Sequence, residues 1–310
     1  MTPAALPLHG RVVAITGAGR GIGAATARAL AGCGMKVAIG ELDLAAAETT
    51  AAEIGHGAIA LPLDVTSRES FAAFLDAAEA QLGPVDVLVN NAGIMPLSRV
   101  VSESDRTADL LLDVNVRGVM HGSKEALARM GARRRGHIVN IASTAGKGGF
   151  VGGATYCGTK AFVVVFSEAL LLEAREVGVH VSCVMPGVVN TELSAGLGEA
   201  RGVKNAQPED VAAAIVEALQ RPHFDVYVPK SIGPIQTVMT LLPRSWREKF
   251  THALKADSIL DEIDASKRRA YEERVATRSK SAEDAPVAAT PAADGDADVA
   301  TAAPRETVTH

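Results

Sequence analysis

The chain has 310 residues, of which 47% are hydrophobic and 22% are charged. This length is sufficient to bury a large core as one domain or two. The formal net charge is -5, and both signs are scattered along the chain. This pattern argues against a nucleic-acid-binding protein, which relies on a basic face, and favours a small-molecule ligand.

Two further exclusions come from cysteine and histidine spacing and from the hydropathy of the chain. The three cysteines are widely spaced and the histidines form no HxxxH or HxH pair, so we expect neither a disulfide framework nor a metal site. The N-terminus lacks a basic region followed by a long apolar run, and no stretch approaches about 18 apolar residues. We therefore expect a cytoplasmic protein.

Short Val- and Ile-rich runs alternate with segments of helical periodicity in the first 230 residues or so. The predicted strands lie at 11–17, 36–40, 57–65, 85–93, 136–143, 179–187 and 224–229, and the predicted helices at 21–34, 44–55, 69–83, 110–130, 156–178 and 208–220. The strands are too continuously apolar to have a solvated face. The pattern predicts an α/β fold with a Rossmann-type doubly wound parallel sheet, whose ligands bind at the carboxyl ends of the strands.

The character of the sequence changes near residue 234. Residues 235–255 carry an apolar stripe with interspersed Arg and Lys residues and Trp246. Such a helix suits packing over the chain's own pocket, packing on a partner subunit, or peripheral contact with an anionic membrane. A second helical pattern follows from about 257 to 276, and residues 279–310 contain no Leu, Ile, Met, Phe, Tyr or Trp. We predict a catalytic domain at 1–233, an amphipathic helical extension at 234–278 and a disordered tail at 279–310.

Tyr156 and Lys160 lie four residues apart in the stretch YCGTK. In a helix these positions project from one face, about one turn apart. A neighbouring ammonium group stabilises a phenolate, so Lys160 is expected to lower the pKa of Tyr156 from its usual value of about 10. The pair alone also occurs in helices by chance, so its interpretation depends on other motifs.

A glycine-rich turn, TGAGRGIG, spans Thr16 to Gly23 between the first predicted strand and the first predicted helix. It has the pattern TGxxxGxG, with Gly17, Gly21 and Gly23 in the fixed places. Glycines allow positive φ and close backbone approach, and a helix N-terminus offers free N–H groups to a pyrophosphate. The turn therefore predicts a dinucleotide-binding site.

Several motifs together carry a resemblance to a known family. They are TGAGRGIG, NNAG at Asn90–Gly93, Asn115 in DVNVRG, Ser143 in IVNIASTAG, YCGTK, and PGVVNT at Pro186–Thr191. In order and spacing, these motifs resemble the classical short-chain dehydrogenase/reductase (SDR) family. The resemblance extends over roughly residues 10–229.

The resemblance implies a role for each of four residues. Tyr156 would be the acid/base that exchanges a proton with the substrate oxygen as hydride moves to or from the nicotinamide. Lys160 would lower the pKa of Tyr156 and hydrogen-bond the nicotinamide ribose, and Ser143 would hold the substrate oxygen. Asn115 would kink its helix and position a water in a proton relay. Taken singly, Ser143 could satisfy a strand end and Asn115 could lie on a helix surface.

The cofactor is predicted to be NAD. Glu41 follows the second predicted strand, where an acidic side chain accepts hydrogen bonds from the adenosine ribose and repels a 2′-phosphate. The alternative is NADP, with Arg20 as the phosphate-binding cation. The resemblance implies that the cofactor-binding residues are Gly17, Arg20, Gly21, Ile22, Gly23, Glu41, Asp64, Val65, Asn90, Ala92, Gly93, Tyr156, Lys160, Pro186, Val189 and Thr191.

The expected walls of the substrate pocket are apolar overall. They are Ile94, Met95, Pro96, Leu97, Phe150, Val151, Leu193 and Leu197. We therefore expect a lipophilic secondary alcohol or ketone, such as a steroid, retinoid or aliphatic compound. The alternatives are an NADPH-dependent carbonyl reductase of the same fold and a non-catalytic dinucleotide-binding sensor or scaffold. The resemblance also implies a homodimer or homotetramer that pairs through helices at 110–130 and 156–176.

Overall fold

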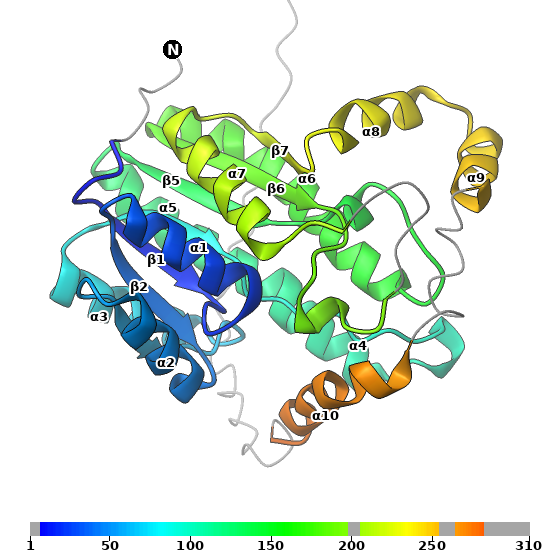
Figure 1. The fold of residues 1–310 in the computed structure, drawn as a ribbon. Coiled ribbons are helices and arrows are strands. Elements are labelled where there is room, and N and C mark those ends of the chain that lie inside the picture. The colour runs from blue at the N-terminus through cyan, green and yellow to red at the C-terminus, as the bar shows by residue number, and fades with distance from the viewer. Residues whose placement is uncertain (1–6, 198–204, 254–263, 282–310) are drawn as a thin grey trace, which may run out of the picture.

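The structure is a computed structural model that describes residues 7–197, 205–253 and 264–281. Its centre is a seven-stranded sheet in which every strand pairs in parallel, in the order β3-β2-β1-β4-β5-β6-β7 (Figure 1). The strands are β1 (Val12–Thr16), β2 (Lys36–Glu41), β3 (Ile59–Pro62), β4 (Val85–Asn90), β5 (Gly136–Ile141), β6 (Val179–Pro186) and β7 (Asp225–Val228). The predicted Rossmann-type doubly wound sheet is confirmed.

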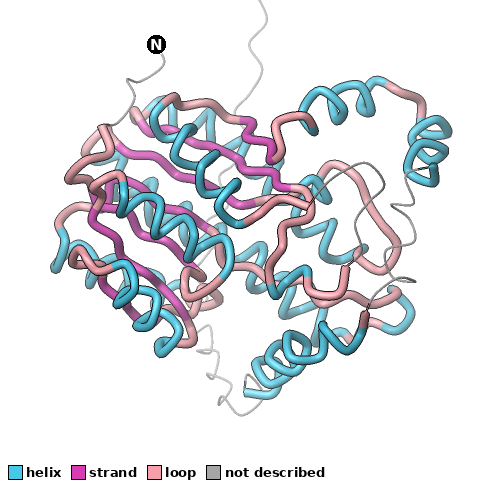
Figure 2. The backbone as a smooth tube through the Cα atoms, in the orientation of Figure 1, coloured by secondary structure: helices cyan, strands magenta, loops and turns pink. Residues whose placement is uncertain are grey.

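The helices follow the strands along the chain, as the tube in Figure 2 shows. They are α1 (Gly21–Gly32), α2 (Leu44–Ile54), α3 (Arg68–Leu82), α4 (Asp105–Leu112), α5 (Gly118–Ala132), α6 (Ala154–Glu176), α7 (Pro208–Gln220), α8 (Ile232–Leu241), α9 (Arg244–Ala253) and α10 (Ala265–Ser281). Short 3-10 turns lie at Val100–Ser102, Thr144–Gly146 and Glu192–Ser194.

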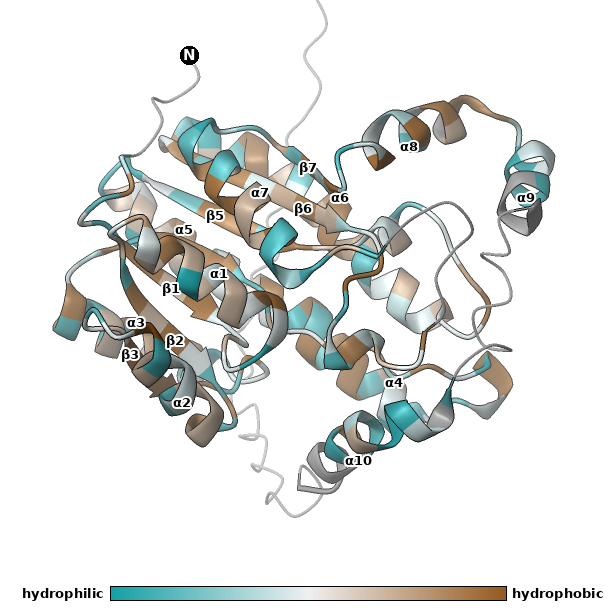
Figure 3. Cartoon of the chain, in the orientation of Figure 1, coloured by the Kyte–Doolittle hydropathy of each residue, from teal (hydrophilic) through white to brown (hydrophobic). Residues whose placement is uncertain are grey.

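Two apolar layers sandwich the sheet. Helices α1, α2 and α7 cover one face with residues such as Leu30, Ala47 and Ile215. Helices α3, α5 and α6 cover the other face with residues such as Phe74 and Met130. Figure 3 shows the apolar strands between these helices. Burial on both faces explains why the central strands are continuously apolar.

The two edge strands differ from the expectation that every strand is buried on both faces. In β3 the first three residues are half-buried and Pro62 is exposed, and in β7 Asp225 is exposed and Tyr227 is half-buried. An edge strand has a neighbour on one side only, and side chains at the margin of the sheet are covered less completely. The apolar character of these runs therefore overstates their burial.

The helix predicted at 110–130 is interrupted in the structure. Helix α4 ends at Leu112, a π-helical turn spans Asp113–Arg117, and α5 begins at Gly118. A π-helical turn inserts an extra residue into the helical repeat and is frequent at functional sites. Asn115 lies in the middle of this turn.

The C-terminal extension contains three described helices instead of the two predicted patterns. The predicted segment 235–255 divides into α8 and α9 because Pro243 lacks an N–H group and forces Leu242 into an extended conformation, with ψ at 144°. Helix α10 ends at Ser281, beyond the predicted start of the tail at 279. The predicted helical residues 257–263 and the predicted disordered residues 282–310 lie outside the described residues. Among the described helices, none combines the length and the apolar character needed to cross a membrane.

Candidate active site

The carboxyl ends of β1 and β4 form the point at which the strand order reverses, because β2 continues on one side and β5 on the other. Ligands of doubly wound sheets bind in the crevice at this point. The glycine turn follows β1, and the segment NNAG follows the buried strand β4. The two predicted cofactor motifs therefore meet at one edge of the sheet.

At Gly17 and Gly23 the glycine turn is packed too closely for a side chain. Gly17 has φ of 65°, and a Cβ atom on it would lie 2.8 Å from the Cα atom of Ala92. A Cβ atom on Gly23 would lie 2.5 Å from the carbonyl oxygen of Gly17. Gly21 has φ of 55° and faces the methyl group of Thr191, to which its Cβ atom would come within 3.4 Å. Glycine is required here by both backbone conformation and space.

The N-terminus of α1 differs from those of the next three helices, α2, α3 and α4. Side chains cap α2, α3 and α4, since Asp43, Ser67 and Ser104 each accept a hydrogen bond from a backbone N–H group of the first turn. At α1 the N-cap residue Arg20 makes no side-chain cap, and the first turn contains no acidic residue. The first N–H groups of this helix are thus available to an anion, which fits the pyrophosphate of a dinucleotide.

Asn91 holds the glycine turn in place, although the sequence analysis did not single it out. Its side-chain amide donates to the carbonyl oxygens of Thr16 and Gly17, each at 2.9 Å. The Thr16 hydroxyl in turn accepts from the backbone N–H groups of Asn91 and Ala92, each at 3.0 Å. The doubled asparagine in NNAG is the signal that could have identified it.

Asn90 was predicted to line the path of the cofactor, but its side chain faces the interior. It is buried, and its amide donates to the Asn140 side chain at 2.8 Å and the Ser123 hydroxyl at 3.3 Å. Its carbonyl oxygen lies against Gly122, where a Cβ atom would come within 2.2 Å. The Asn90 side chain therefore links β4, β5 and α5.

Glu41 ends β2 beside the glycine turn. Its carboxylate accepts from the backbone N–H groups of Gly19 at 3.2 Å and Leu42 at 2.9 Å. Arg20, the alternative phosphate-binding residue, instead forms a 2.7 Å ion pair with Asp43. This hydrogen bond lowers the pKa of Asp43 and raises the pKa of Arg20. The Glu41 carboxylate is therefore held beside the glycine turn by two N–H groups, whereas the Arg20 cation is paired with Asp43.

Two further predicted cofactor-binding residues, Asp64 and Val65, follow β3. The Asp64 carboxylate accepts from the N–H group of Thr66 at 3.0 Å and from its hydroxyl at 2.8 Å. Val65 is buried against α5, where a Cβ atom on Gly118 would lie 3.0 Å from it. These residues form a tight turn after the strand.

Asn115 connects the helix α4–α5 region to the loop after β4. Its side-chain carbonyl accepts from the N–H group of Ile94, and its amide donates to the carbonyl of Ile94, each at 2.9 Å. The amide also donates to the Thr159 hydroxyl at 3.2 Å. A Cβ atom on Gly93 would lie 3.3 Å from Asn115 Oδ1 and 3.6 Å from Lys160 Nζ. The Asn115 side chain is buried, forms these three hydrogen bonds in the protein interior and does not lie on a helix surface.

Ser143, Tyr156 and Lys160 lie together beyond the ends of β5 and β6. The Ser143 hydroxyl forms a hydrogen bond with the Tyr156 phenol and donates to the carbonyl of Pro186 at 3.4 Å. Lys160 Nζ lies 5.9 Å from the centre of the Tyr156 ring and donates to the carbonyl of Ile141 at 2.9 Å. All three side chains are buried. The predicted spacing on one helix face is present in α6.

The electrostatics of the pair differ from the expectation. Burial raises the pKa of Tyr156 above its usual range, the hydrogen bond from Ser143 opposes this shift, and the nearby phenol of Tyr271 adds to it. Burial also lowers the pKa of Lys160 to about 8. Desolvation penalises both charged forms. The largest cause of the raised pKa of Tyr156 is therefore its burial.

The loop after β6 carries the remaining predicted cofactor contacts. Val189 is buried and pairs with Ala206, and its carbonyl accepts from the hydroxyls of Ser194 and Thr191. The N–H group of Thr191 donates to the Ser194 hydroxyl at 3.2 Å. This network begins the 3-10 turn Glu192–Ser194 and holds Thr191 opposite Gly21.

The expected substrate walls are partly buried against the core. Ile94 and Met95 are buried, Leu97, Phe150, Leu193 and Leu197 are half-buried, and Val151 is exposed. The Phe150 and Tyr156 rings lie 6.5 Å apart, centre to centre. Helix α10 was predicted as a helical pattern, but its contact with this region was not: Arg268 and Tyr271 contact Met95. Long sequence separation gave no local signal for this contact.

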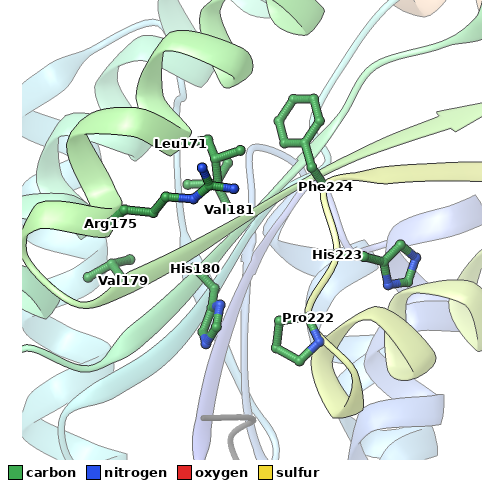
Figure 4. A pocket seen from close by; sticks show the side chains of 8 residues that line it. All are labelled: Leu171, Arg175, Val179, His180, Val181, Pro222, His223 and Phe224. Carbon is green, nitrogen blue, oxygen red and sulfur yellow. The ribbon is translucent and has the colours of Figure 1, made fainter. Parts of the chain in front are cut away.

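A small pocket of about 50 Å³ lies elsewhere, at the amino ends of β6 and β7 (Figure 4). Its lining residues come from α6, β6 and the segment before β7: Leu171, Arg175, Val179, His180, Val181, Pro222, His223 and Phe224. None of them belongs to the predicted site. Among the described residues, no group of three or more His, Cys, Asp or Glu side chains is placed to hold a metal ion.

A doubly wound sheet, an uncapped helix behind a glycine turn, and a buried Ser-Tyr-Lys cluster define a nicotinamide-dinucleotide-binding oxidoreductase. Residues 11–202 match the short chain dehydrogenase family. The chain belongs to this family, and the resemblance seen in the sequence is confirmed.

Similar proteins include enzymes named for sugar alcohols. The chain is 35% identical to galactitol 2-dehydrogenase of Agrobacterium fabrum, covering 70% of this chain and 86% of that protein. It is 39% identical to sorbitol dehydrogenase of Cereibacter sphaeroides, over 60% of this chain and 73% of that protein. It is also 36% identical to glycine betaine reductase ATRR of Emericella nidulans over 70% of this chain, but spans only 18% of that protein.

Two solved structures share the fold. A short chain dehydrogenase/reductase from Burkholderia phymatum in complex with NAD matches with a TM-score of 0.70 and 27% identity, over 76% of this chain and 94% of that chain. A 3-ketoacyl-(acyl-carrier-protein) reductase from Brucella melitensis complexed with NADH matches with a TM-score of 0.64 and 31% identity, over 71% and 98%. The chain is therefore an oxidoreductase of the alcohol dehydrogenase type with a nicotinamide cofactor.

Proposed function

We propose that the protein uses NAD(H) to interconvert a hydroxyl and a carbonyl group of a lipophilic substrate. The observation that carries the proposal is the buried cluster of Ser143, Tyr156 and Lys160 beside the glycine turn. When bound, the nicotinamide supplies or accepts the hydride. The glycine turn, the uncapped N-terminus of α1 and the loop at Thr191 would hold the dinucleotide.

The protein residues manage the proton and the substrate oxygen. In the reducing direction the Tyr156 hydroxyl donates its proton to the carbonyl oxygen while the Ser143 hydroxyl hydrogen-bonds the same oxygen. The Lys160 ammonium stabilises the phenolate that remains. In the oxidising direction Tyr156 takes the proton of the alcohol. Asn115 holds the loop at Ile94 and the helix of Lys160 in register, as its three hydrogen bonds indicate.

We favour NAD over NADP because Glu41 is held at the end of β2 by two backbone N–H groups. A fixed carboxylate suits the ribose hydroxyls and repels a 2′-phosphate. Arg20 is already paired with Asp43. Direct titration of NADH and NADPH tests this, and Glu41→Gln should raise the relative affinity for NADPH by about tenfold. The exposed Glu53→Gln serves as the control, and a native preference for NADPH would overturn the assignment.

We favour a lipophilic substrate because the walls expected for the pocket pack with the apolar core on the Tyr156 side of the sheet. The names of two relatives point instead to polyols. A panel of steroid, retinoid and aliphatic secondary alcohols, run beside galactitol and sorbitol with NAD, decides between the two classes. Faster turnover of the polyols would reject the lipophilic assignment. Dinucleotide binding without turnover of either class would favour a sensor or scaffold.

We propose that α8 and α9 make the membrane contact considered for residues 235–255. Ile235, Val238, Leu241 and Trp246 are exposed to 45, 57, 81 and 63%. Exposed basic residues of α9, including Arg244 and Lys249, suit an anionic surface. In sedimentation with vesicles containing about one third anionic lipid, the double variant Leu241→Ser/Trp246→Ser should lose binding. Equal sedimentation of both proteins would contradict the contact.

We also propose a homodimer or homotetramer that pairs through α4, α5 and α6. The exposed apolar residues Leu112 on α4 and Val165 and Leu172 on α6 support this surface. Charged substitutions there, such as Val165→Glu, should reduce the mass measured by light scattering. A monomeric native protein would contradict the proposal.

A further inference from the structure

Helix α10 has one buried face in a chain region that the family motifs do not reach. Arg268 and Tyr271 are exposed to only 1% and 8%, and Val275 on the same face is half-buried. These positions follow helical spacing, and the other described side chains of α10 are exposed. An arginine this deeply buried requires partners for its charge and its N–H groups.

Arg268 finds these partners on two separate loops. Its Nη1 donates to the carbonyl of Leu193 at 3.0 Å, and its Nη2 donates to the carbonyl of Met95. Its Nε donates to the Glu272 carboxylate at 3.0 Å, and the guanidinium lies 5.1 Å from the ring centre of Tyr271. Met95 belongs to the loop after β4 and Leu193 to the loop after β6. One side chain therefore joins the two loops expected to wall the substrate pocket.

Tyr271 adds a second contact to the loop after β4. Its hydroxyl accepts from the N–H group of Met95 at 2.6 Å. Burial raises the pKa of Tyr271 to about 12, so it remains a neutral phenol. Its proximity contributes to the raised pKa of Tyr156. Tyr271 thus lies near enough to Tyr156 for the two phenols to interact electrostatically.

Two peripheral contacts fasten α10 along the loop after β6. The N–H group of Asp264, just before the helix, donates to the carbonyl of Gly196 at 3.0 Å. On the exposed side, Arg274 pairs with Glu192 at 2.6 Å. Together with Arg268, these contacts follow the loop from Glu192 to Gly196.

We propose that Arg268 and Tyr271 are positioning residues that hold the two substrate loops together and make α10 the closing wall of the substrate site. We call these two residues the α10 clamp. This inference rests on the proposed function and names what fixes its substrate specificity. The clamp uses the N–H and carbonyl groups of Met95 and the carbonyl of Leu193, so these main-chain polar groups are already paired within the protein. A lipophilic substrate suits a wall of this kind.

The proposal depends on the planar guanidinium group of Arg268, with its several N–H donors, and not on its positive charge alone. A planar guanidinium donates in several fixed directions at once, whereas an ammonium group is a point charge on a flexible stem. Arg268→Lys should therefore rescue only part of the effect of Arg268→Gln. Tyr271→Phe removes the acceptor of a buried N–H group and keeps the ring.

The kinetic test compares Arg268→Gln and Tyr271→Phe with Arg269→Gln, an exposed neighbour on the same helix. With the best substrate of the panel, the two clamp variants should raise KM by about tenfold or more and leave NADH affinity within about twofold. Arg269→Gln should match the native protein. Unchanged KM in both clamp variants would overturn the proposal, as would an equal loss of NADH affinity and substrate affinity.

Hydrogen exchange supplies a readout that does not depend on turnover. In the native full-length chain, amides of residues 92–98 and 192–197 should be protected, and both clamp variants should lose this protection by about tenfold or more. Equal protection in native and variant proteins would overturn the clamp even if the enzyme is active. Lost protection with no turnover in the native protein would support the clamp and reject the proposed function, so the two failures are distinguishable.

Discussion

The cofactor half and the substrate half of the site are built in different ways. The glycine turn is fixed by glycines, by main-chain contacts and by Asn91, which belongs to the next motif at the same sheet edge. The substrate half is joined by Arg268 and Tyr271, which lie 173 and 176 residues from Met95 along the chain. Backbone conformation therefore determines the first half, whereas side-chain contacts between residues far apart in the sequence determine the second.

The largest expected effect concerns the proton transfer that both halves serve. Tyr156→Phe should lower kcat by about 10²–10⁴-fold while NADH affinity changes by less than about twofold, because only the hydroxyl is removed. Steady-state kinetics and fluorescence titration measure the two quantities. Tyr227→Phe, a half-buried tyrosine of β7, is the matched control. If Tyr156→Phe retains more than about a tenth of native kcat, Tyr156 is not the acid/base.

The next effect tests the backbone origin of the cofactor half. Gly17→Ala should lower the free energy of unfolding by about 2–5 kcal/mol, since the left-handed backbone costs about 1–2 kcal/mol and the contact with Ala92 adds about 1–3 kcal/mol. Gly57 has a similar φ of 74°, but the space around it is open. Gly57→Ala should therefore lower the free energy of unfolding only by the backbone contribution of about 1–2 kcal/mol. Urea unfolding measures both, and equal losses would show that close packing is unimportant.

A third prediction addresses the sheet that both halves share. His137 is fully buried, hydrogen-bonds Ser182 at 2.8 Å and has its pKa lowered by burial to about 3. The unfolded chain binds this proton near pH 6.5 and the folded protein does not, so stability present above pH 6.5 is lost as pH falls toward about 3. From pH 7 to pH 5 the loss is about 2 kcal/mol.

Thermal unfolding at several pH values measures this loss, with His137→Gln as the comparison. The variant removes the titrating group and offers an amide to Ser182. Its stability should depend less on pH between 7 and 5 than that of the native protein. Identical pH dependence in the two proteins would contradict the assignment to His137.

The smallest effect separates the α10 clamp from its surroundings. Arg274 and Glu192 are both about half exposed, and an ion pair of this kind contributes less than about 1 kcal/mol. Arg274→Gln should therefore leave KM within about twofold of native and change stability little. A loss as large as that of Arg268→Gln would show that the whole face of α10, and not the two buried residues, holds the loops.

Much of the fold and of the cofactor half could be predicted from the sequence. Buried parallel strands need continuous apolar runs, and a turn with φ of 65° at Gly17 needs glycine, so both leave local marks. The spacing of Tyr156 and Lys160 likewise predicts one helix face. These features depend on residues that are near one another in the chain.

The remainder depends on the tertiary environment. The raised pKa of Tyr156 follows from its burial, which a spacing of four residues does not report. Asn90 and Asn91 are adjacent and identical, yet one faces the interior and the other the glycine turn, because successive residues at a strand end point to opposite sides. Arg268 belongs to the residue type that is seldom buried, so nothing in the sequence of α10 predicts its position.

On the two loops that it joins, Arg268 donates hydrogen bonds only to main-chain carbonyl groups. The side chains of Met95 and Leu193 can therefore be exchanged without removing either acceptor. A protein engineer could re-line this wall for a different ligand by substituting the loop side chains and leaving α10 unaltered. If the two loops wall the substrate site as proposed, natural variation has the same freedom, because the carbonyl groups that bind Arg268 and the side chains are separate atoms of the same residues.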